Sequence, residues 1–237
     1  MKVKLIAITK YLGHEIEADD PSGSEALIEH AGRVCYHSED SAKAEARARF
    51  IQRRVTEGHE SIIEHASASF EISGISRACS HQLVRHRLAS YSQESQRYVD
   101  MSDPEWVVPA DVASDPEAMA LWNEFGEFSR SAYRRLLERG VKKQDARFLL
   151  PNATATRLVM TANFRELLHV FRLRISPQAQ WEIRELSVQM LEAVYPFAPN
   201  VFGPLRHQLR ASYPSFFAGV DSSEGNGVGC THPQRTP

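Results

Sequence analysis

The stretch HASASFEISGIS, residues 65–76, alternates apolar and polar side chains, and no other feature of the sequence limits the fold as strongly. Ala66, Ala68, Phe70 and Ile72 fall on one side of this alternation. Successive side chains of a β-strand point to opposite faces, so a period of two predicts a strand whose apolar face is covered. The chain is therefore expected to build part of its core on a β-sheet.

Two more segments have strand character, and several have helical character. VKLIAIT, residues 3–9, is short, β-branched and bounded by polar residues, which predicts a buried strand, and residues 154–163 predict another. Asp115 followed by Pro116 is typical of a helix start, and Asn163 followed by Glu166 resembles a capping box. Helices are predicted over residues 24–34, 42–57, 115–140 and 163–173, and a last long helix is predicted to begin at Ser176–Pro177.

The helix predicted over residues 115–140 is expected to bury one apolar stripe. The residues of this stripe recur at helical spacing and are Leu121, Phe125, Phe128, Ala132 and Leu136. No repeat or linker interrupts residues 1–220, so these are predicted to form a single domain of mixed helices and strands. Residues 221–237 are rich in Gly, Ser and Pro, which predicts a disordered tail.

Composition and charge exclude several classes of protein. The chain has 237 residues and a net charge of −2, so no overall basic field draws it to nucleic acid. Its three cysteines, Cys35, Cys79 and Cys230, are too few and too scattered for a disulfide framework or a zinc cluster. No apolar run approaches the roughly 20 residues of a membrane span, and the apolar run near Met1 is too short for a signal peptide. These features predict a soluble protein of a reducing compartment, the cytoplasm.

The stretch RHRLASYSQESQRY, residues 85–98, concentrates hydrogen-bond donors and leaves three interpretations open. Its cations could form a solvated edge, as most short charge runs do. They could bind nucleic acid with a tyrosine stacked on a base, although the acidic net charge opposes this. They could also bind an anionic small molecule, because guanidinium groups grip phosphate and amides read base edges. Arg165, His169 and Arg172 share one face of the helix predicted after Asn163, which supports the third interpretation.

Other motifs predict no further chemistry. HESIIEH, residues 59–65, lacks the spacing of zinc-protease helices, and no metal site is predicted. The glycine cluster at residues 225–229 lacks the flanking strand and helix of a dinucleotide fingerprint. Cys79 is interpreted as a small buried thiol and not as a nucleophile. Ser95 has no identifiable general base, so its hydroxyl is expected to hydrogen-bond a ligand.

Several motifs together resemble one family, the flavin-dependent thymidylate synthases. Arg85-His86-Arg87, seven residues and then Ser95 match that family's RHR-x7-S signature. The other similar segments, in the family's order and spacing, are AGRVCYHSE (31–39), GHESIIEH (58–65), ARFLLP (146–151), NFRELLHVFRLR (163–174) and AQWEIR (179–184). The resemblance covers roughly residues 1–200, and several motifs in order are far more specific than one.

The resemblance implies an α+β (mixed α/β) fold with a central, mostly antiparallel sheet flanked by helices. It implies a homotetramer whose active sites draw on several subunits, with FAD bound without a dinucleotide fingerprint. The implied reaction methylates dUMP to dTMP, with 5,10-methylenetetrahydrofolate as carbon donor and NADPH as reductant. No cysteine attacks the uracil ring in this family. An arginine would instead stabilise negative charge at N3 and O4 of the ring.

Motif matching carries the family's site onto this sequence. Arg174 is implied as the catalytic arginine. The implied dUMP-binding residues are Gln82, Leu83, Val84, Arg85, Gln93, Glu94, Ser95, Gln96, Arg97, Arg147 and Arg174. The implied FAD-binding residues are Ser61, Arg85, His86, Arg87, Gln93, Asn163, Phe164, Arg165 and His169. His59 and Tyr91 are implied on the folate and nicotinamide side of the flavin.

Two positions depart from the family's pattern. Many relatives carry a His-Ala pair where this chain reads Gln178-Ala179, and His169 stands where an amide is common. Two other functions stay open from the sequence. One is a binding module for nucleotides or nucleic acid, and the other is a flavoprotein reductase without methyl transfer.

Overall fold

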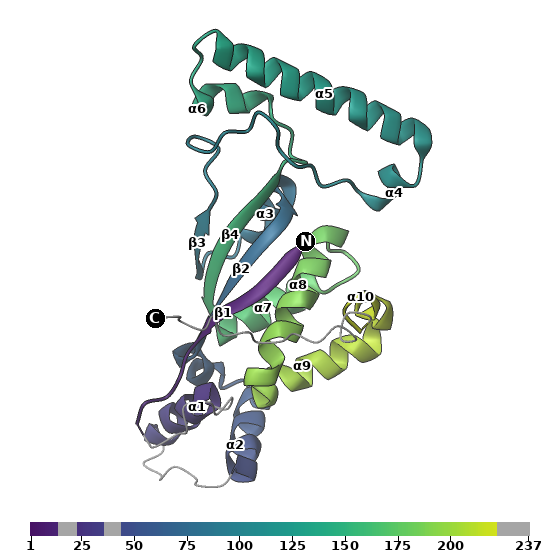
Figure 1. Cartoon of the computed structure of the whole chain (residues 1–237). Helices are drawn as coiled ribbons and strands as arrows, with labels where there is room; N and C mark the ends of the chain where they lie inside the picture. The colour runs from purple at the N-terminus through teal and green to yellow at the C-terminus, as the bar shows by residue number, and fades with distance from the viewer. Residues whose placement is uncertain (14–22, 36–43, 222–237) are drawn as a thin grey trace, which may run out of the picture.

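The computed structural model describes residues 1–13, 23–35 and 44–221, and at its centre is a four-stranded antiparallel sheet. The strand order is β1 (Lys2–Ile8), β2 (Ser67–Ser76), β4 (Ala155–Asn163) and β3 (Ala89–Gln93) (Figure 1). The two inner strands, β2 and β4, pair along their whole length although they are far apart in sequence. The predicted α+β fold is confirmed. The predicted tail beyond residue 221 lies outside the described residues.

Strand β2 confirms the prediction made from its alternating residues. Ala68, Phe70 and Ile72 are fully buried in the main hydrophobic core. The register with β4 shifts between Ser73 and Ile75, and the intervening Gly74 has a φ of 70°. A glycine with positive φ accommodates such an irregularity without steric cost.

Strand β1 forms as predicted, but the prediction that it is buried was wrong. It lies at the edge of the sheet and, among the described strands, pairs with β2 alone. Val3, Leu5 and Ile8 are half-buried against the core, whereas Ile6 is 45% exposed. An edge strand of this kind has one covered face, and a short apolar run cannot distinguish it from an inner strand.

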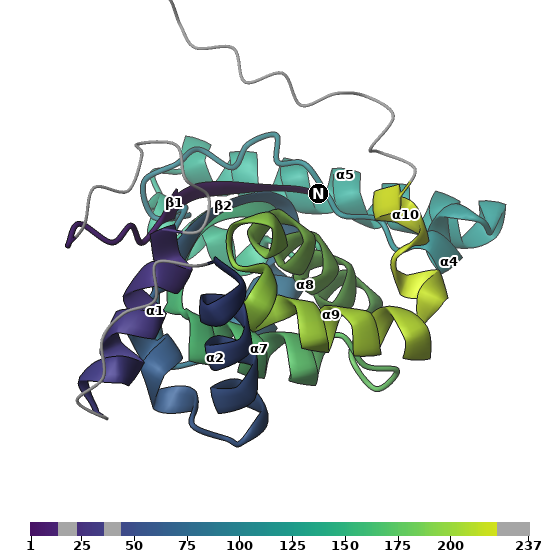
Figure 2. The same cartoon turned by 90° about the horizontal axis from the view of Figure 1, so that it is seen from below.

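Helices cover one face of the sheet. Helices α7 (Phe164–Arg174), α8 (Trp181–Val194) and α9 (Pro199–Ser212) pack on one another, and α8 contacts β1 and β2 (Figure 2). Helix α8 begins at Trp181, not at Ser176–Pro177, because the side chain of Gln180 accepts hydrogen bonds from the N–H groups of Glu182 and Ile183. Helix α9 was not predicted, since Pro204 stands inside it and interrupts the helical pattern.

The predicted helix caps are present. Asp115 accepts hydrogen bonds from the N–H groups of Glu117 and Ala118 at the start of α5 (Pro116–Glu138). Asn163 accepts one from the N–H of Glu166 at the start of α7. Helices α1 (Gly23–Val34) and α2 (Ala44–Thr56) lie at one end of the molecule beside the 3₁₀ helix η1 (Glu60–His65). The shorter elements are α3 (Arg77–Leu83), α4 (Ala110–Ala113), α6 (Lys143–Ala146), η2 (Arg147–Leu149), η3 (Tyr195–Phe197), η4 (Pro214–Phe216) and α10 (Ala218–Asp221).

Of the apolar stripe predicted to be buried on α5, the first three residues are instead exposed, whereas Ala132 and Leu136 are half-buried. Helices α4, α5 and α6 stand at the end of the sheet remote from α1 and α2 (Figure 1). Leu121, Phe125 and Phe128 are 68%, 53% and 70% exposed. Helix α5 buries a narrower strip of residues, Gly126, Ser129 and Tyr133, and this strip packs near α6, η2 and Met101. Within the described residues, no helix has the length and apolarity needed to cross a bilayer.

Candidate active site

The arginine-rich turn follows α3, whose first turn is anchored in the core. The hydroxyl of Ser76 accepts a hydrogen bond from the N–H of Cys79 at 2.9 Å. The buried carboxylate of Glu182 accepts two from Ser76, one from its N–H and one from its hydroxyl, both at 2.6 Å. These contacts hold the start of α3 against α8, so the residues after Leu83 turn at a fixed place.

The turn points its three basic residues in different directions. Arg85 and Arg87 are exposed, whereas His86 is 4% exposed and points inward. Tyr91 of β3 fixes the turn, because its hydroxyl lies 2.9 Å from the carbonyl oxygen of Leu83 and 3.0 Å from that of His86. Burial, followed by the charge of Glu166, raises the pKa of Tyr91, so the phenol stays protonated and donates.

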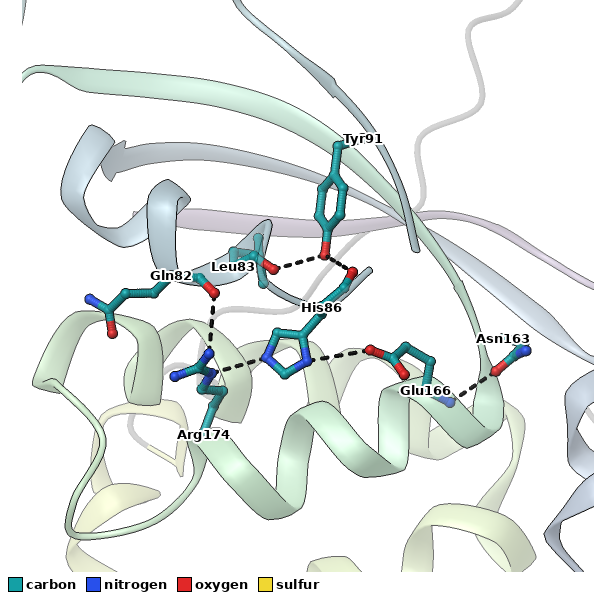
Figure 3. Close-up of polar contacts among 7 residues, drawn as sticks. All are labelled: Gln82, Leu83, His86, Tyr91, Asn163, Glu166 and Arg174. Carbon is teal, nitrogen blue, oxygen red and sulfur yellow. Dashed lines mark hydrogen bonds and ion pairs between the residues drawn. The ribbon is translucent and has the colours of Figure 1, made fainter. Parts of the chain in front are cut away.

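His86 lies between two residues of α7 (Figure 3). Its Nδ1 is 3.3 Å from Oε1 of Glu166, which is itself buried. Its Nε2 accepts a hydrogen bond from Nε of Arg174 at 3.0 Å. Burial, with the charges of Arg174 and His169, lowers the pKa of His86 to about 4. The imidazole is therefore neutral near pH 7.

Arg174 is a half-buried cation with no carboxylate partner in the part of the chain that the structure describes. Besides His86, it donates from Nη2 to the carbonyl oxygen of Gln82 at 3.2 Å. Burial lowers its pKa, although a guanidinium stays protonated in proteins. Of its five N–H donors these two contacts use two, which leaves three for a ligand.

A second group of positively charged side chains lies at the start of α3, the end opposite the arginine-rich turn. Arg77 and Arg147 line a pocket of about 270 Å³ together with His81, Gln96 and Asn152. Burial and the nearby charge of Arg147 lower the pKa of Arg77. The positive charges of these two arginines repel each other across the pocket, and an anion such as phosphate bound between them would neutralise that repulsion. Arg77 was not among the site residues predicted from the sequence.

The residues implied for dUMP fall into two groups within one chain. Gln82, Arg85 and Arg174 gather at the end of α3, and Gln96 and Arg147 line the pocket at its start. The side chain of Leu83 is fully buried, so only its backbone faces the turn. The remaining implied residues are Val84, Gln93, Glu94, Ser95 and Arg97. The side-chain amide of Gln93 donates to Ser80 and Thr156, and Glu94 pairs with Arg157. The hydroxyl of Ser95 accepts a hydrogen bond from the N–H of Arg97, and the side chains of Val84 and Arg97 are exposed.

The residues implied for FAD gather mainly around α7 and η1. His169 lies edge-on to His86, with 5.6 Å between the ring centroids. Arg165 pairs with Glu60 and Glu64, and Ser61 is exposed between these two acids. The side chain of Phe164 is buried against Phe202. Of the others, Arg85 and Arg87 are exposed, and Asn163 caps α7. Of the two residues implied on the folate and nicotinamide side, His59 is exposed and Tyr91 holds the turn.

Glu166 is the second residue that the sequence-based site missed. It was interpreted as half of a capping box, but its carboxylate lies against His86. A signal was present, because Glu166 stands among Phe164, Leu167 and Val170 on the inward side of α7. A charge on the apolar face of a helix requires a buried partner.

Two of the three cysteines lie within the described residues. Cys79 is fully buried, and burial together with the charge of Glu182 raises the pKa of its thiol. Cys35 is exposed, and Cys230 lies outside the described residues. A thiol that is buried and hard to ionise is a poor nucleophile.

Sequence comparison identifies the family to which the chain is similar. The sequence model of the family described as "Thymidylate synthase complementing protein" matches residues 18–200. The flavin-dependent thymidylate synthase of Geobacter sulfurreducens is 45% identical over 186 residues, which cover 75% of this chain and 80% of that protein. That of Mycolicibacterium gilvum is 41% identical over 221 residues, which cover 85% and 88%.

The matched residues include β2, β3, β4, α3, the arginine-rich turn and α7, so they include the whole candidate site. The chain is therefore an enzyme. The chain belongs to the flavin-dependent thymidylate synthase family.

Proposed function

We propose that this protein methylates dUMP to dTMP, with 5,10-methylenetetrahydrofolate as carbon donor, NADPH as reductant and FAD as bound cofactor. The relatives are named flavin-dependent thymidylate synthases, which supports a flavin and this product. The proposal includes a mechanism without a cysteine nucleophile, a homotetramer as the assembly and the cytoplasm as the compartment.

The observation that carries the proposal is the state of Arg174. Its charge has no carboxylate partner among the described residues, and three of its N–H groups remain for a ligand. C5 of uracil is a weak nucleophile unless negative charge on the ring is stabilised. A fixed guanidinium beside N3 and O4 of the uracil ring would stabilise that charge while C5 attacks the carbon that the folate donates. Arg147 and Arg77, at the other end of α3, are suited to the nucleotide's phosphate.

The exposed polar residues of the turn and of α7 suit a flavin dinucleotide. Arg85 and Arg87 are exposed and make no ion pair within the described residues, so their charges are available to a diphosphate. Ser61 and His169 add hydrogen-bonding groups on the neighbouring surface. FAD bound there would supply the reducing equivalents that it takes from NADPH.

The exposed stripe on α5 supports an oligomer. Leu121, Phe125 and Phe128 form an apolar surface on one helix, and exposed apolar patches of this kind mark contact with another protein. The residues implied for dUMP lie in two groups within one chain, which is consistent with sites that subunits share.

Steady-state kinetics of arginine variants tests the proposed role of Arg174. Arg174→Ala should lower kcat on the order of 10²–10³-fold, as expected for the loss of one charge-stabilising donor. Arg174→Lys should recover little, because a point charge does not reproduce a planar guanidinium. Arg147→Ala should mainly raise the KM for dUMP.

Arg53→Ala is the control, since Arg53 is an exposed arginine of α2 that pairs with Glu57 four residues along the chain. Its kcat should stay near that of the wild type. A near-normal kcat for Arg174→Ala at saturating dUMP would mean that Arg174 only holds the substrate. Flavin reduction without any dTMP would identify a reductase and refute the proposed function.

A further inference from the structure

Glu166 and His86 form a buried line of contacts that ends at Arg174, and the reaction as described gives Glu166 no role. The side chains of His86 and Glu166 are 3% and 6% exposed. The distances are 3.3 Å from Glu166 to Nδ1 and 3.0 Å from Nε2 to Nε of Arg174. Figure 3 shows the imidazole bridging two residues that lie two turns apart on α7.

The partners fix which nitrogen of His86 carries the proton. A guanidinium has donors and no acceptor, so Nε2 can face Arg174 only as a lone pair. The proton of the neutral ring therefore lies on Nδ1, which is 3.3 Å from the Glu166 carboxylate. The low pKa of His86, about 4, is consistent with a neutral ring.

The same contact fixes the orientation of Arg174. Its Nε is held by His86 and its Nη2 by the carbonyl oxygen of Gln82. Two bonds to different nitrogens of a planar group determine both its position and the direction of its plane. The direction of the three remaining N–H groups therefore depends on His86 being an acceptor.

We propose that Glu166 and His86 are positioning residues for Arg174: Glu166 holds the proton on Nδ1 of His86, and Nε2 then accepts from Nε of Arg174 and orients the guanidinium. The inference rests on the proposed function where it concerns turnover. Without an acceptor at Nδ1, the ring can place its proton on Nε2. That nitrogen would then present a donor to a donor, and the contact with Arg174 would be lost.

The first test reads Arg174 directly and needs neither substrate nor flavin. Solvent exchange of the Nε–H of Arg174 is measured by ¹⁵N NMR on the full chain labelled at arginine. His86→Leu and Glu166→Leu should each speed this exchange at least about tenfold, since both remove the bond that protects it. His86→Gln should slow it again, because the glutamine oxygen can reach the place of Nε2.

The second test uses turnover and a double-mutant cycle. His86→Leu and Glu166→Leu should lower kcat by about 100-fold, the cost of a misplaced catalytic group, with a smaller change in the KM for dUMP. His86→Gln should recover part of this loss. In the Arg174→Ala background, neither leucine variant should lower kcat further, because both act through the guanidinium.

Glu25→Leu is the matched control, since Glu25 is a buried carboxylate that accepts hydrogen bonds from Asn200. It should lower stability and leave the exchange of Arg174 unchanged. Unchanged exchange in His86→Leu, or kcat losses that add to that of Arg174→Ala, would overturn the inference. A wild-type protein that forms no dTMP would instead refute the proposed function, and the exchange data would still decide the positioning role.

Discussion

The buried, neutral state of His86 predicts a specific dependence of stability on pH. The folded protein binds a proton at this ring with a pKa of about 4, whereas an unfolded chain does so near 6.5. Between these values the unfolded state binds more protons, so the free energy of unfolding falls as the pH falls. From pH 7.5 to pH 5 the contribution of His86 should fall by about 2 kcal/mol, and the full loss below pH 4 is about 3 kcal/mol.

The assay compares the wild type with His86→Gln, whose side chain does not titrate. Urea unfolding at pH 7.5, 6 and 5 is followed by tryptophan fluorescence at one protein concentration. The wild type should lose about 2 kcal/mol more than the variant between pH 7.5 and pH 5. His207→Gln, which removes an exposed imidazole on α9, controls for the loss of one histidine. A constant difference between wild type and His86→Gln over this range would refute the buried neutral histidine.

Two further predictions test the helix cap and the exposed stripe. Asn163→Ala removes the 2.9 Å bond to the N–H of Glu166 and should lower the free energy of unfolding by about 1 kcal/mol, measured in urea; an unchanged urea midpoint would contradict the cap. Replacing Phe125 and Phe128 together by serine should shift the protein to smaller assemblies in sedimentation velocity, because the apolar stripe on α5 would lose its largest side chains. An unchanged mass would place the interface elsewhere.

The features that the sequence predicted well are those that local chemistry determines. The strand β2 follows from alternation alone, and the caps at Asp115 and Asn163 follow from one side chain and the backbone beside it. The burial of β1 and of the α5 stripe depends on what lies next to each element. A helix pattern shows that an apolar face exists, and only the fold shows whether the same chain covers it.

In the candidate site too, the sequence predicted what local composition determines and missed what the packing of distant segments determines. The turn at residues 85–87 was found because cations and amides are concentrated there. Its composition could not show that His86 points inward while the two arginines stay exposed. That orientation depends on Glu166 and Tyr91, which approach from α7 and β3.

Because Glu166 comes from a distant segment, the turn around His86 can take its final form only once the core has assembled there. Tyr91 and Glu166 are 5 and 80 residues from His86 along the chain, and Glu166 reaches it only when α7 packs beside α3. Before that packing, His86 has neither its acceptor nor its donor, and burying it would cost more than leaving it in water. The turn therefore takes its final form together with the contact between β4, α7 and α3. A substitution in the core beneath α7 should for this reason disturb Arg174 as well as stability, since the same packing holds the guanidinium and the apolar side chains.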